Sequence, residues 1–434
     1  MTMTIPKRIS SALLGSLAAG VVPRIGLEYI AVGRHREIKA LLQDLDNIAA
    51  GGAGFRIIVG RYGSGKSFLL QLIRNHAMDR GFVVADADLS PERRLTGSQR
   101  QGVATYRELM KNLATKVRPD GGALPALLER WIATVQMQVA RDSGLEPGQE
   151  TFFDEVERQI VAVISQMEEL VHGFDFAAVL SSYWRGYREG NDELKDAALR
   201  WLRGEFATKT EARQALGVRV IIDDDSWYDY VKLMAQLVVG LGYRGLIIVL
   251  DEMVNLYKIS HTQSRQANYE KYLTMFNDTM QGKASHLGII SAGTTQFVED
   301  TRRGLFSYEA LRSRLAESRL LPSGLLDTSG PILRLEPLSY EELFVLLTRL
   351  QEIHGAHYGQ ASRLGEAELT LFLQEAVNRL GAAELLTPRE VIRDFITLLN
   401  LLEQHPELDF KQLLGGMDFH KDENKDDDLA EFVL

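Results

Sequence analysis

The sequence predicts an α/β fold in which helices pack against a parallel sheet, with a large helical insertion and a helical C-terminal domain. A short apolar strand at 55–59 leads through a glycine-rich loop and an amphipathic helix to a second strand at 82–86. Such strand–helix–strand units produce parallel strands. Helical patterns fill the long stretch that follows and the chain after Pro337. Further strand patterns occur at 246–250, 287–291 and 332–335.

The composition is that of a folded globular protein. The 434 residues are 45% hydrophobic and 25% charged, which is enough apolar chain for two or three domains. The absence of cysteine excludes a disulfide framework, a thiolate zinc site and a cysteine nucleophile. A formal net charge of -10 disfavours a sequence-independent binder of polyanions, but it leaves room for a local basic face that binds DNA.

The N-terminal residues imitate a secretory signal peptide. Lys7 and Arg8 precede an apolar stretch at 9–22, as in such a signal. Serines interrupt the stretch, however, and its apolar residues recur at the spacing of one helix face. We therefore predict an amphipathic helix that ends near Gly20. Because no stretch approaches the ~18 consecutive apolar residues of a membrane span, we expect a cytoplasmic protein without a membrane partner.

The order of these patterns divides the chain into parts. We expect an N-terminal helical segment at 1–50, a core at 51–335 with its insertion at about 105–217, a C-terminal helical domain at 336–417 and an acidic tail at 418–434. The insertion is expected to hold helices at 105–117, 123–141, 151–171 and 192–203. The C-terminal domain, a lid or a winged helix, is expected to hold helices at 339–354, 366–380, 388–404 and 408–414.

The strongest motif follows the first strand. Residues 60–67 read Gly-Arg-Tyr-Gly-Ser-Gly-Lys-Ser and match GxxxxGK[ST] between a strand and a helix. Glycines let backbone N–H groups point at phosphate oxygens, and the helix N-terminus adds a positive dipole end. Lys66 would reach the β- and γ-phosphates of ATP, and the Ser67 hydroxyl would bind Mg²⁺. The residues expected to bind the nucleotide here are Gly60, Arg61, Tyr62, Gly63, Ser64, Gly65, Lys66, Ser67 and Phe68.

A second motif supplies carboxylates. Five apolar residues at 246–250 form a strand that ends in Asp251 and Glu252. Asp251 would hold Mg²⁺ or its water, and Glu252 would polarise the water that attacks ATP. A P-loop kinase or a GTP switch needs no glutamate at this position. The pair therefore favours ATP hydrolysis.

The strand at 287–291 is expected to carry a polar sensor of the nucleotide. In additional-strand ATPases such a strand lies between the two motifs, and its polar residue hydrogen-bonds the γ-phosphate or the attacking water. Ser291, Thr294 and Thr295 are the candidates, and we include Thr294 in the predicted site. An ordinary turn is the alternative for each of them.

Arginines are expected to complete the site. Arg312 or Arg314 lies after the sensor strand, where an arginine could stabilise charge on the transferred phosphate across a subunit boundary. Arg389 lies in the first turn of a helix, where it could contact the γ-phosphate. Arg34 precedes another helix and could contact the adenine side. Surface ion pairs are the alternative for Arg312 and Arg314. Together these motifs predict the three-layer core of an AAA+-like P-loop ATPase.

Three other clusters have structural interpretations. His354 and His357 are spaced like metal ligands but have no third ligand nearby. The acidic run at 223–225 could suggest a metal site, but it is better suited to cap the helix that follows. Trp184 and Tyr187, with neighbouring arginines, could stack on nucleic-acid bases. Burial in a core is the favoured interpretation for these aromatic residues.

With these elements in order, the chain resembles the ATP-binding proteins of bacterial BREX phage-defence systems, the BrxD-type P-loop family. The resemblance covers nearly the whole chain. The nucleotide motifs are shared by many families, whereas Ser-Pro-Glu-Arg-Arg at 90–94 and Asp-Asp-Ser-Trp-Tyr at 224–228 are more discriminating. The resemblance to this family is carried by the stretches 60–67, 88–95, 224–228, 308–315 and 387–390.

The resemblance implies a role in defence against phage, with other defence-system proteins and DNA as partners. ATP and Mg²⁺ are the expected cofactors, and we expect a homo-oligomer. The leading hypothesis is an ATPase that couples ATP binding and hydrolysis to DNA engagement or complex assembly. A nucleotide-gated scaffold with slow turnover and no direct action on DNA is the alternative.

Overall fold

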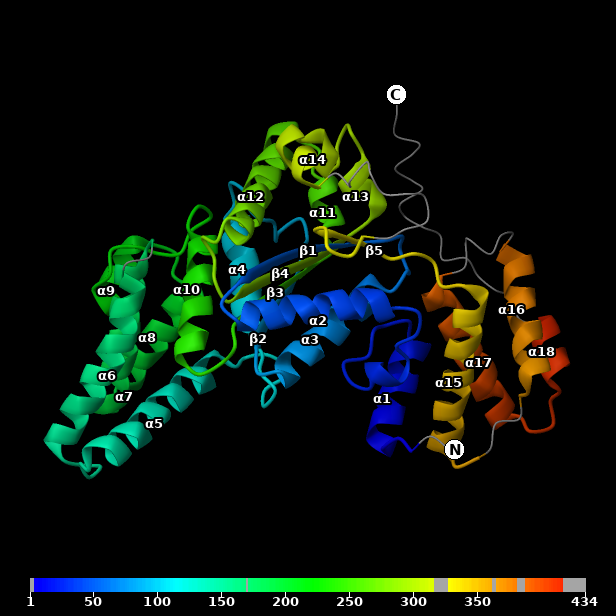
Figure 1. The fold of residues 1–434 in the computed structure, drawn as a ribbon, viewed down its shortest axis with the longest axis horizontal. Coiled ribbons are helices and arrows are strands. Elements are labelled where there is room, and N and C mark those ends of the chain that lie inside the picture. The colour runs from blue at the N-terminus through cyan, green and yellow to red at the C-terminus, as the bar shows by residue number, and fades with distance from the viewer. Residues whose placement is uncertain (1–3, 169–170, 316–326, 361–363, 381–386, 417–434) are drawn as a thin grey trace. The chain divides into compact units, whose positions relative to one another are not determined.

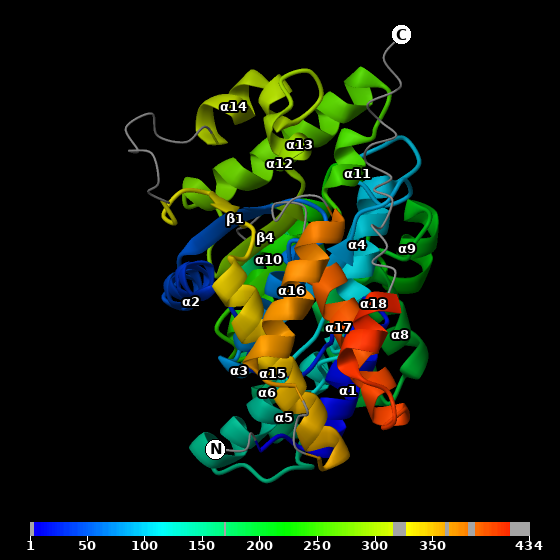
Figure 2. The ribbon, with the colours of Figure 1, turned by 90° about the vertical axis from the view of Figure 1, so that its right-hand side faces the viewer.

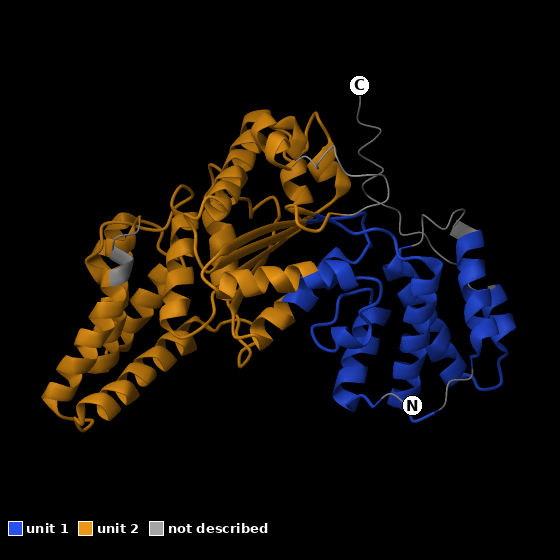
Figure 3. Ribbon diagram, viewed as in Figure 1, with its two compact units in different colours: residues 1–39, 58–73, 333–434 blue, residues 40–57, 74–332 orange. Residues whose placement is uncertain are grey.

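The computed structural model describes residues 4–168, 171–315, 327–360, 364–380 and 387–416. The chain forms two compact units (Figure 3). Unit 1 contains 1–39, 58–73 and 333–434, and unit 2 contains 40–57 and 74–332. The chain passes between them several times, so each unit is built from separate segments. We describe each unit by itself.

The strands of the described residues form a five-stranded sheet with the order β2-β3-β4-β1-β5 (Figure 1). β2 pairs in parallel with β3, and β3 pairs in parallel with β4. Backbone bonds from Ile57 to Pro331 and from Leu335 to Val59 follow the pattern of a parallel β1–β5 pair. The parallel sheet predicted from the sequence is therefore confirmed. The strands are β1 Ala53–Val59, β2 Val83–Asp88, β3 Leu246–Asp251, β4 Leu287–Gly293 and β5 Ile332–Arg334.

Helices cover both faces of this sheet within unit 2. Ile48 of α2 (His35–Ala49) lies over Gly54 and Gly288, where a Cβ at either glycine would contact its side chain. The ring of Phe55, the next residue along β1, packs edge-on against the aromatic side chains of α12 (Thr262–Met280), Tyr272 and Phe276. Because successive strand residues point to opposite faces, α2 and α12 lie on opposite sides of the sheet.

Between β2 and β3 the chain of unit 2 is helical. The predicted helices are present, with ends shifted by a few residues, and two further helices, α7 and α9, had not been predicted. α7 buries residues around most of its circumference, so it shows no single apolar stripe, while α9 buries only Ala212 and Leu216. The helices are α4 Gln101–Lys111, α5 Leu124–Ser143, α6 Glu150–Glu168, α7 Gly173–Glu189, α8 Asp192–Leu202, α9 Lys209–Leu216 and α10 Trp227–Gly240.

The aromatic residues of α7 belong to the core. Trp184 is buried and stacks on Tyr187 with 6.1 Å between ring centres. Arg188 forms an ion pair with Glu157 of α6 at 2.8 Å. Since the indole is not on the surface, the interpretation as core packing is supported over a base-stacking site.

Unit 2 also contains α11 Val254–Tyr257, α13 Thr295–Glu299 and α14 Glu309–Leu315.

Unit 1 is built around a helical core (Figure 2). The amphipathic N-terminal helix is confirmed as α1 (Lys7–Ala18), and it packs its leucines against α15 (Tyr340–Tyr358) and α17 (Pro388–Gln404). α16 (Glu366–Leu380) and α18 (Phe410–Gly416) complete this core, and α3 is Lys66–Asp79. None of the described helices is long and apolar enough to cross a membrane.

The two spaced histidines of α15 contact neighbouring helices. His354 is buried, and its Nε2 lies 3.1 Å from the side-chain oxygen of Asn400. His357 pairs through Nδ1 with the Ser10 hydroxyl at 2.9 Å. Burial lowers the pKa of His354, which favours the neutral ring. These contacts join α15 to α17 and to α1, which agrees with a structural role for both histidines.

Candidate functional site

In unit 1, residues 60–67 form the loop between β1 and α3 that the sequence predicts, called the P-loop below. Gly63 and Gly65 have φ values of +74° and +94°, a left-handed backbone that other residues rarely adopt. A Cβ added at Gly65 would meet nothing within 4 Å, so its Cα faces open space. The loop therefore has the left-handed glycine conformations that the motif predicts, with open space beside Gly65.

Lys66 begins α3 and turns back over the P-loop. Its Nζ donates to the carbonyl oxygens of Gly60 at 2.9 Å and of Arg61 at 2.7 Å. The Ser64 hydroxyl is buried and has no hydrogen-bond partner among the described residues. The Lys66 ammonium group is therefore held by two neutral carbonyl oxygens of the loop. It can exchange these neutral acceptors for charged phosphate oxygens.

The first turn of α17 contacts the tip of the P-loop. Arg389 donates from Nη1 to the Tyr62 hydroxyl at 2.7 Å, and its guanidinium carbon lies 4.8 Å from the centre of the Tyr62 ring. Thr387 caps α17 in a capping box, and a Cβ on Gly63 would come within 2.8 Å of its side chain. The arginine predicted to sense the γ-phosphate is thus brought to the nucleotide motif.

Arg34 is also brought to the P-loop, but against its backbone. The side chain is 6% exposed, and Nη2 donates to the Ser64 carbonyl oxygen at 3.1 Å. Its Nη1 lies 3.6 Å from a carboxylate oxygen of Glu37. Burial lowers the pKa of Arg34, and the carboxylates of Glu37, Glu342 and Glu336 act in the opposite direction. The sequence pattern suggested a base contact and gave no sign of this backbone contact.

In unit 2, β3 ends in the predicted acidic pair. Asp251 is its last residue, and its Oδ1 accepts the backbone N–H of Glu252 at 2.8 Å. Glu252 is exposed and has φ +56°, an uncommon conformation for a residue with a side chain. Such backbone strain is found preferentially at functional sites.

A further carboxylate lies beside the pair. Asp88 ends β2 directly opposite Asp251 in the parallel register. Burial raises the pKa of Asp88, and the negative charges of Asp251 and Asp86 add to the effect. Sequence reasoning gave Asp88 no role. The acidic end of the second strand was the available signal, since carboxyl ends of parallel strands meet at one edge of a sheet.

The polar residues of the sensor strand differ in their surroundings. Ser291 is fully buried in β4, where its Oγ donates to the Arg56 carbonyl at 3.2 Å and accepts from the Tyr272 hydroxyl at 2.5 Å. These bonds occupy the Ser291 hydroxyl inside the core. Thr294 is partly exposed and caps α13 by accepting the Phe297 N–H at 3.2 Å. Of these two, Thr294 has the more accessible hydroxyl.

Arg312 and Arg314, the arginines predicted to act across a subunit boundary, both lie on the exposed side of α14. Arg314 donates to the side chain of Asn277 at 3.1 Å and to the Ala310 carbonyl at 2.8 Å. Arg312 lies 3.9 Å from Glu309 on the same helix. These contacts leave the choice between Arg312 and Arg314 open.

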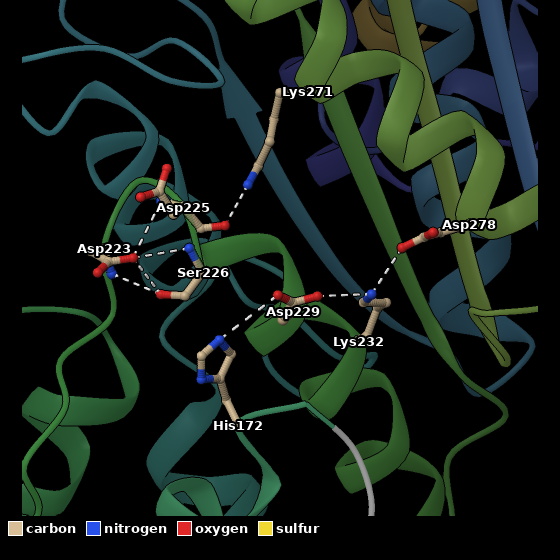
Figure 4. Close-up of polar contacts among 8 residues, drawn as sticks. All are labelled: His172, Asp223, Asp225, Ser226, Asp229, Lys232, Lys271 and Asp278. Carbon is tan, nitrogen blue, oxygen red and sulfur yellow. Dashed lines mark hydrogen bonds and ion pairs between the residues drawn. The ribbon is translucent and has the colours of Figure 1, made fainter.

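Figure 4 shows the contacts of Asp223 and Asp225, which belong to the acidic run 223–225 before α10. Asp223 accepts from the N–H and the hydroxyl of Ser226, so its carboxylate orders the turn before α10 and does not cap the helix's own N–H groups as predicted. Asp224 was expected to cap the same helix, and this was wrong: its carboxylate accepts the N–H groups of Gly102 and Val103 in the first turn of α4 and of Gly97 in the loop before it. Because α4 lies far upstream in the sequence, its contact with Asp224 could not be read from local spacing.

The neighbouring charges of the run are also paired (Figure 4). Lys271 donates to the Asp225 carbonyl at 2.6 Å, and Lys232 lies 2.8 Å from both Asp229 and Asp278. His172 lies 3.9 Å from Asp229. Since Lys232 pairs with Asp229 and Asp278, and Lys271 bonds to the backbone of the run, the geometry favours a structural role for this cluster.

The stretches 88–95 and 224–228, which carry the more specific part of the family resemblance, contact one another. Trp227 donates from its indole nitrogen to the Leu95 carbonyl at 2.9 Å. Asn268 of α12 accepts from the backbone N–H groups of Leu95 and Thr96. The loop after β2 is joined to β3 because Leu89 donates to the Asp251 carbonyl at 3.0 Å. The 224–228 stretch therefore fixes the 88–95 loop beside the acidic end of β3.

Replacing Asp224 with alanine is expected to destabilise unit 2 by about 3 kcal/mol, because three backbone N–H groups lose a charged acceptor. The measurement is urea unfolding followed by tryptophan fluorescence. All four tryptophans, Trp131, Trp184, Trp201 and Trp227, belong to unit 2, so the signal reports this unit alone. Asp225→Ala, which changes an exposed neighbour, is the control and should leave the urea concentration at the unfolding midpoint nearly unchanged. Equal midpoints for the two variants would contradict the capping role.

Comparison with known proteins agrees with the resemblance that the motifs suggested. No protein among those with curated functions matches the chain. The model of the family described as BREX system ATP-binding protein BrxC/D matches residues 5–418. The chain therefore belongs to the BrxC/D family of BREX system ATP-binding proteins.

Proposed function

We propose that this BREX protein is an AAA+-like ATPase, which binds Mg-ATP at residues 60–67 and hydrolyses it with Asp251 and Glu252. The strand order carries the proposal. β4 lies between β1, which precedes the P-loop, and β3, which ends in Asp251. A strand inserted between the two nucleotide motifs distinguishes additional-strand ATPases, which use a glutamate to polarise water, from kinases and GTP switches.

The residues of the P-loop fit a nucleotide triphosphate. Gly63 and Gly65 supply the left-handed turns, and Lys66 supplies a charge that can move from carbonyl oxygens to the β- and γ-phosphates. Ser67 and Asp251 would hold Mg²⁺, which neutralises the charge that develops on the phosphates. Arg61, Tyr62 and Phe68 are proposed to contact the nucleotide at the margins of the loop.

Hydrolysis is assigned to Glu252 acting on water. Its carboxylate would accept a proton as the water oxygen bonds to the γ-phosphorus and the bond to ADP breaks. Thr294 is proposed to hold the attacking water or the γ-phosphate. Arg389 is proposed to leave Tyr62 for the γ-phosphate, which would report the nucleotide state to the C-terminal helices.

The AAA+-like assignment implies an assembly. Arg312 or Arg314, on the exposed side of α14, is proposed to act on the nucleotide of a neighbouring copy in a homo-oligomer. The helices between β2 and β3 are proposed as the insertion that contacts DNA or other defence proteins, and the helices after β5 as the lid.

The proposal is tested by phosphate release from ATP, measured with and without duplex DNA, together with gel filtration with and without ATP. Release that duplex DNA stimulates is the expected result. ATP-dependent oligomers without stimulated release would instead indicate a nucleotide-gated scaffold. No phosphate release under any condition, with ATP still bound, would contradict the assignment of hydrolysis.

A further inference from the structure

The contact between Arg34 and the P-loop fixes one peptide plane. In a trans peptide the C=O and the N–H point in opposite directions. The Ser64 carbonyl oxygen accepts from Arg34 at 3.1 Å, so the N–H of Gly65, in the same plane, points away from Arg34. Gly65 is the residue whose Cα faces open space at φ +94°. The Arg34 contact therefore turns the Gly65 N–H away from the buried side of the loop.

Arg34 is held in place from two sides. Gly33 has φ +70°, and a Cβ there would lie 2.5 Å from Leu338 and 2.8 Å from Glu342. Arg349 of α15 donates to the Ala31 carbonyl at 3.1 Å. The stretch before Arg34 is thus fixed against the start of α15, so the guanidinium has little freedom to leave the Ser64 carbonyl.

The charges around Arg34 favour a structural role for its guanidinium over a direct contact with the nucleotide. The carboxylates of Glu37, Glu342 and Glu336 all oppose the lowering of the Arg34 pKa by burial, and the residue is 6% exposed. A guanidinium whose nitrogens already reach a carboxylate and a carbonyl has few donors left for a nucleotide base. Its fork of donors matches the geometry seen here, in which one nitrogen reaches Glu37 and another reaches Ser64.

We propose that Arg34 is a positioning residue for the phosphates of ATP: by holding the Ser64 carbonyl toward the buried side of the loop, it presents the Gly65 N–H to a phosphate oxygen. The inference rests on the proposed phosphate-binding role of residues 60–67. Without the guanidinium, the buried Ser64 carbonyl loses its donor and the 64–65 peptide is free to turn. One N–H of the phosphate cradle would then be lost.

The test compares two ligands, Mg-ATP and Mg-tripolyphosphate, with Arg34→Lys, Arg34→Met and a matched control, Glu37→Gln. Arg34→Lys keeps the charge but has a single nitrogen, which cannot reach both Ser64 and Glu37. Both Arg34 variants should lower the affinity for both ligands by the same factor, about tenfold to a hundredfold, because one hydrogen bond to a charged group is lost. Glu37→Gln leaves the Ser64 contact in place, and its amide oxygen can still accept from Arg34, so it should bind both ligands within about threefold of the unchanged protein.

Three outcomes would overturn the proposal. Weaker ATP binding with unchanged tripolyphosphate binding would assign Arg34 to the base. An equal loss in Glu37→Gln would assign it to general stability, and circular dichroism melting of every variant checks that the helices are intact. Unchanged binding in Arg34→Lys and Arg34→Met would exclude any role. If Lys66→Ala binds ATP as tightly as the unchanged protein, the P-loop assignment itself fails, whatever Arg34 does.

Discussion

Replacing Lys66 with alanine is expected to weaken ATP binding by a hundredfold or more. The lysine is the one side chain of the P-loop that carries a charge into its interior, where it lies on the carbonyls of Gly60 and Arg61. Hydrogen bonds to charged groups contribute roughly 1.5 to 3 kcal/mol each, so losing contacts with two phosphates amounts to about a hundredfold in affinity or more. Isothermal titration of Mg-ATP measures the change directly.

The control for this experiment is another lysine of unit 1. Lys7 is exposed on α1, and Lys7→Ala removes the same charge without touching the P-loop. Its ATP affinity should equal that of the unchanged protein. Tight ATP binding by Lys66→Ala would falsify the assignment of residues 60–67 as the phosphate site.

Glu252→Gln is expected to retain ATP while its turnover falls by about a hundredfold or more, the range that a general base contributes. The glutamine has nearly the same shape, but its amide cannot accept a proton from water. Phosphate release measures turnover, and a separate binding titration measures retention of ATP. The two readouts separate loss of chemistry from loss of binding.

The matched control is Glu270→Gln on the exposed part of α12, which makes the same change away from the sheet edge. It should turn over ATP at the normal rate. Undiminished release by Glu252→Gln would remove Glu252 from the catalytic role. Asp88, which faces Asp251 in the register, would then be the next carboxylate to examine.

Much of the fold could be predicted because its signals are local. Thr387, Pro388 and Glu390 form a helix start with a capping box, and α17 begins and ends where the pattern placed it. The strands were recognisable as apolar runs bounded by glycine or acidic residues. α7 was missed for a physical reason: a helix buried on most sides lacks the polar face that makes helical periodicity visible.

The candidate site likewise contains residues that a local motif reveals and residues that only tertiary packing brings together. Lys66, Ser67 and Asp251 belong to short contiguous motifs, so their roles could be predicted from spacing alone. The contacts of Arg34 with Ser64 and of Asp224 with α4 and the loop before it join residues that are 30 and up to 127 positions apart. Only the packing of unrelated segments determines such pairs. A pattern along one sequence does not encode them.

The place of β1 in the sheet also has a consequence for how the protein is made. Among the described strands β1 is the first to be synthesised, yet its neighbours β4 and β5 come more than two hundred residues later in the sequence. Pairing over such a separation is slow, and an apolar strand with open edges invites association with other chains. During synthesis the segment that carries the nucleotide motif therefore remains an unpaired, aggregation-prone strand until nearly the whole core has been translated.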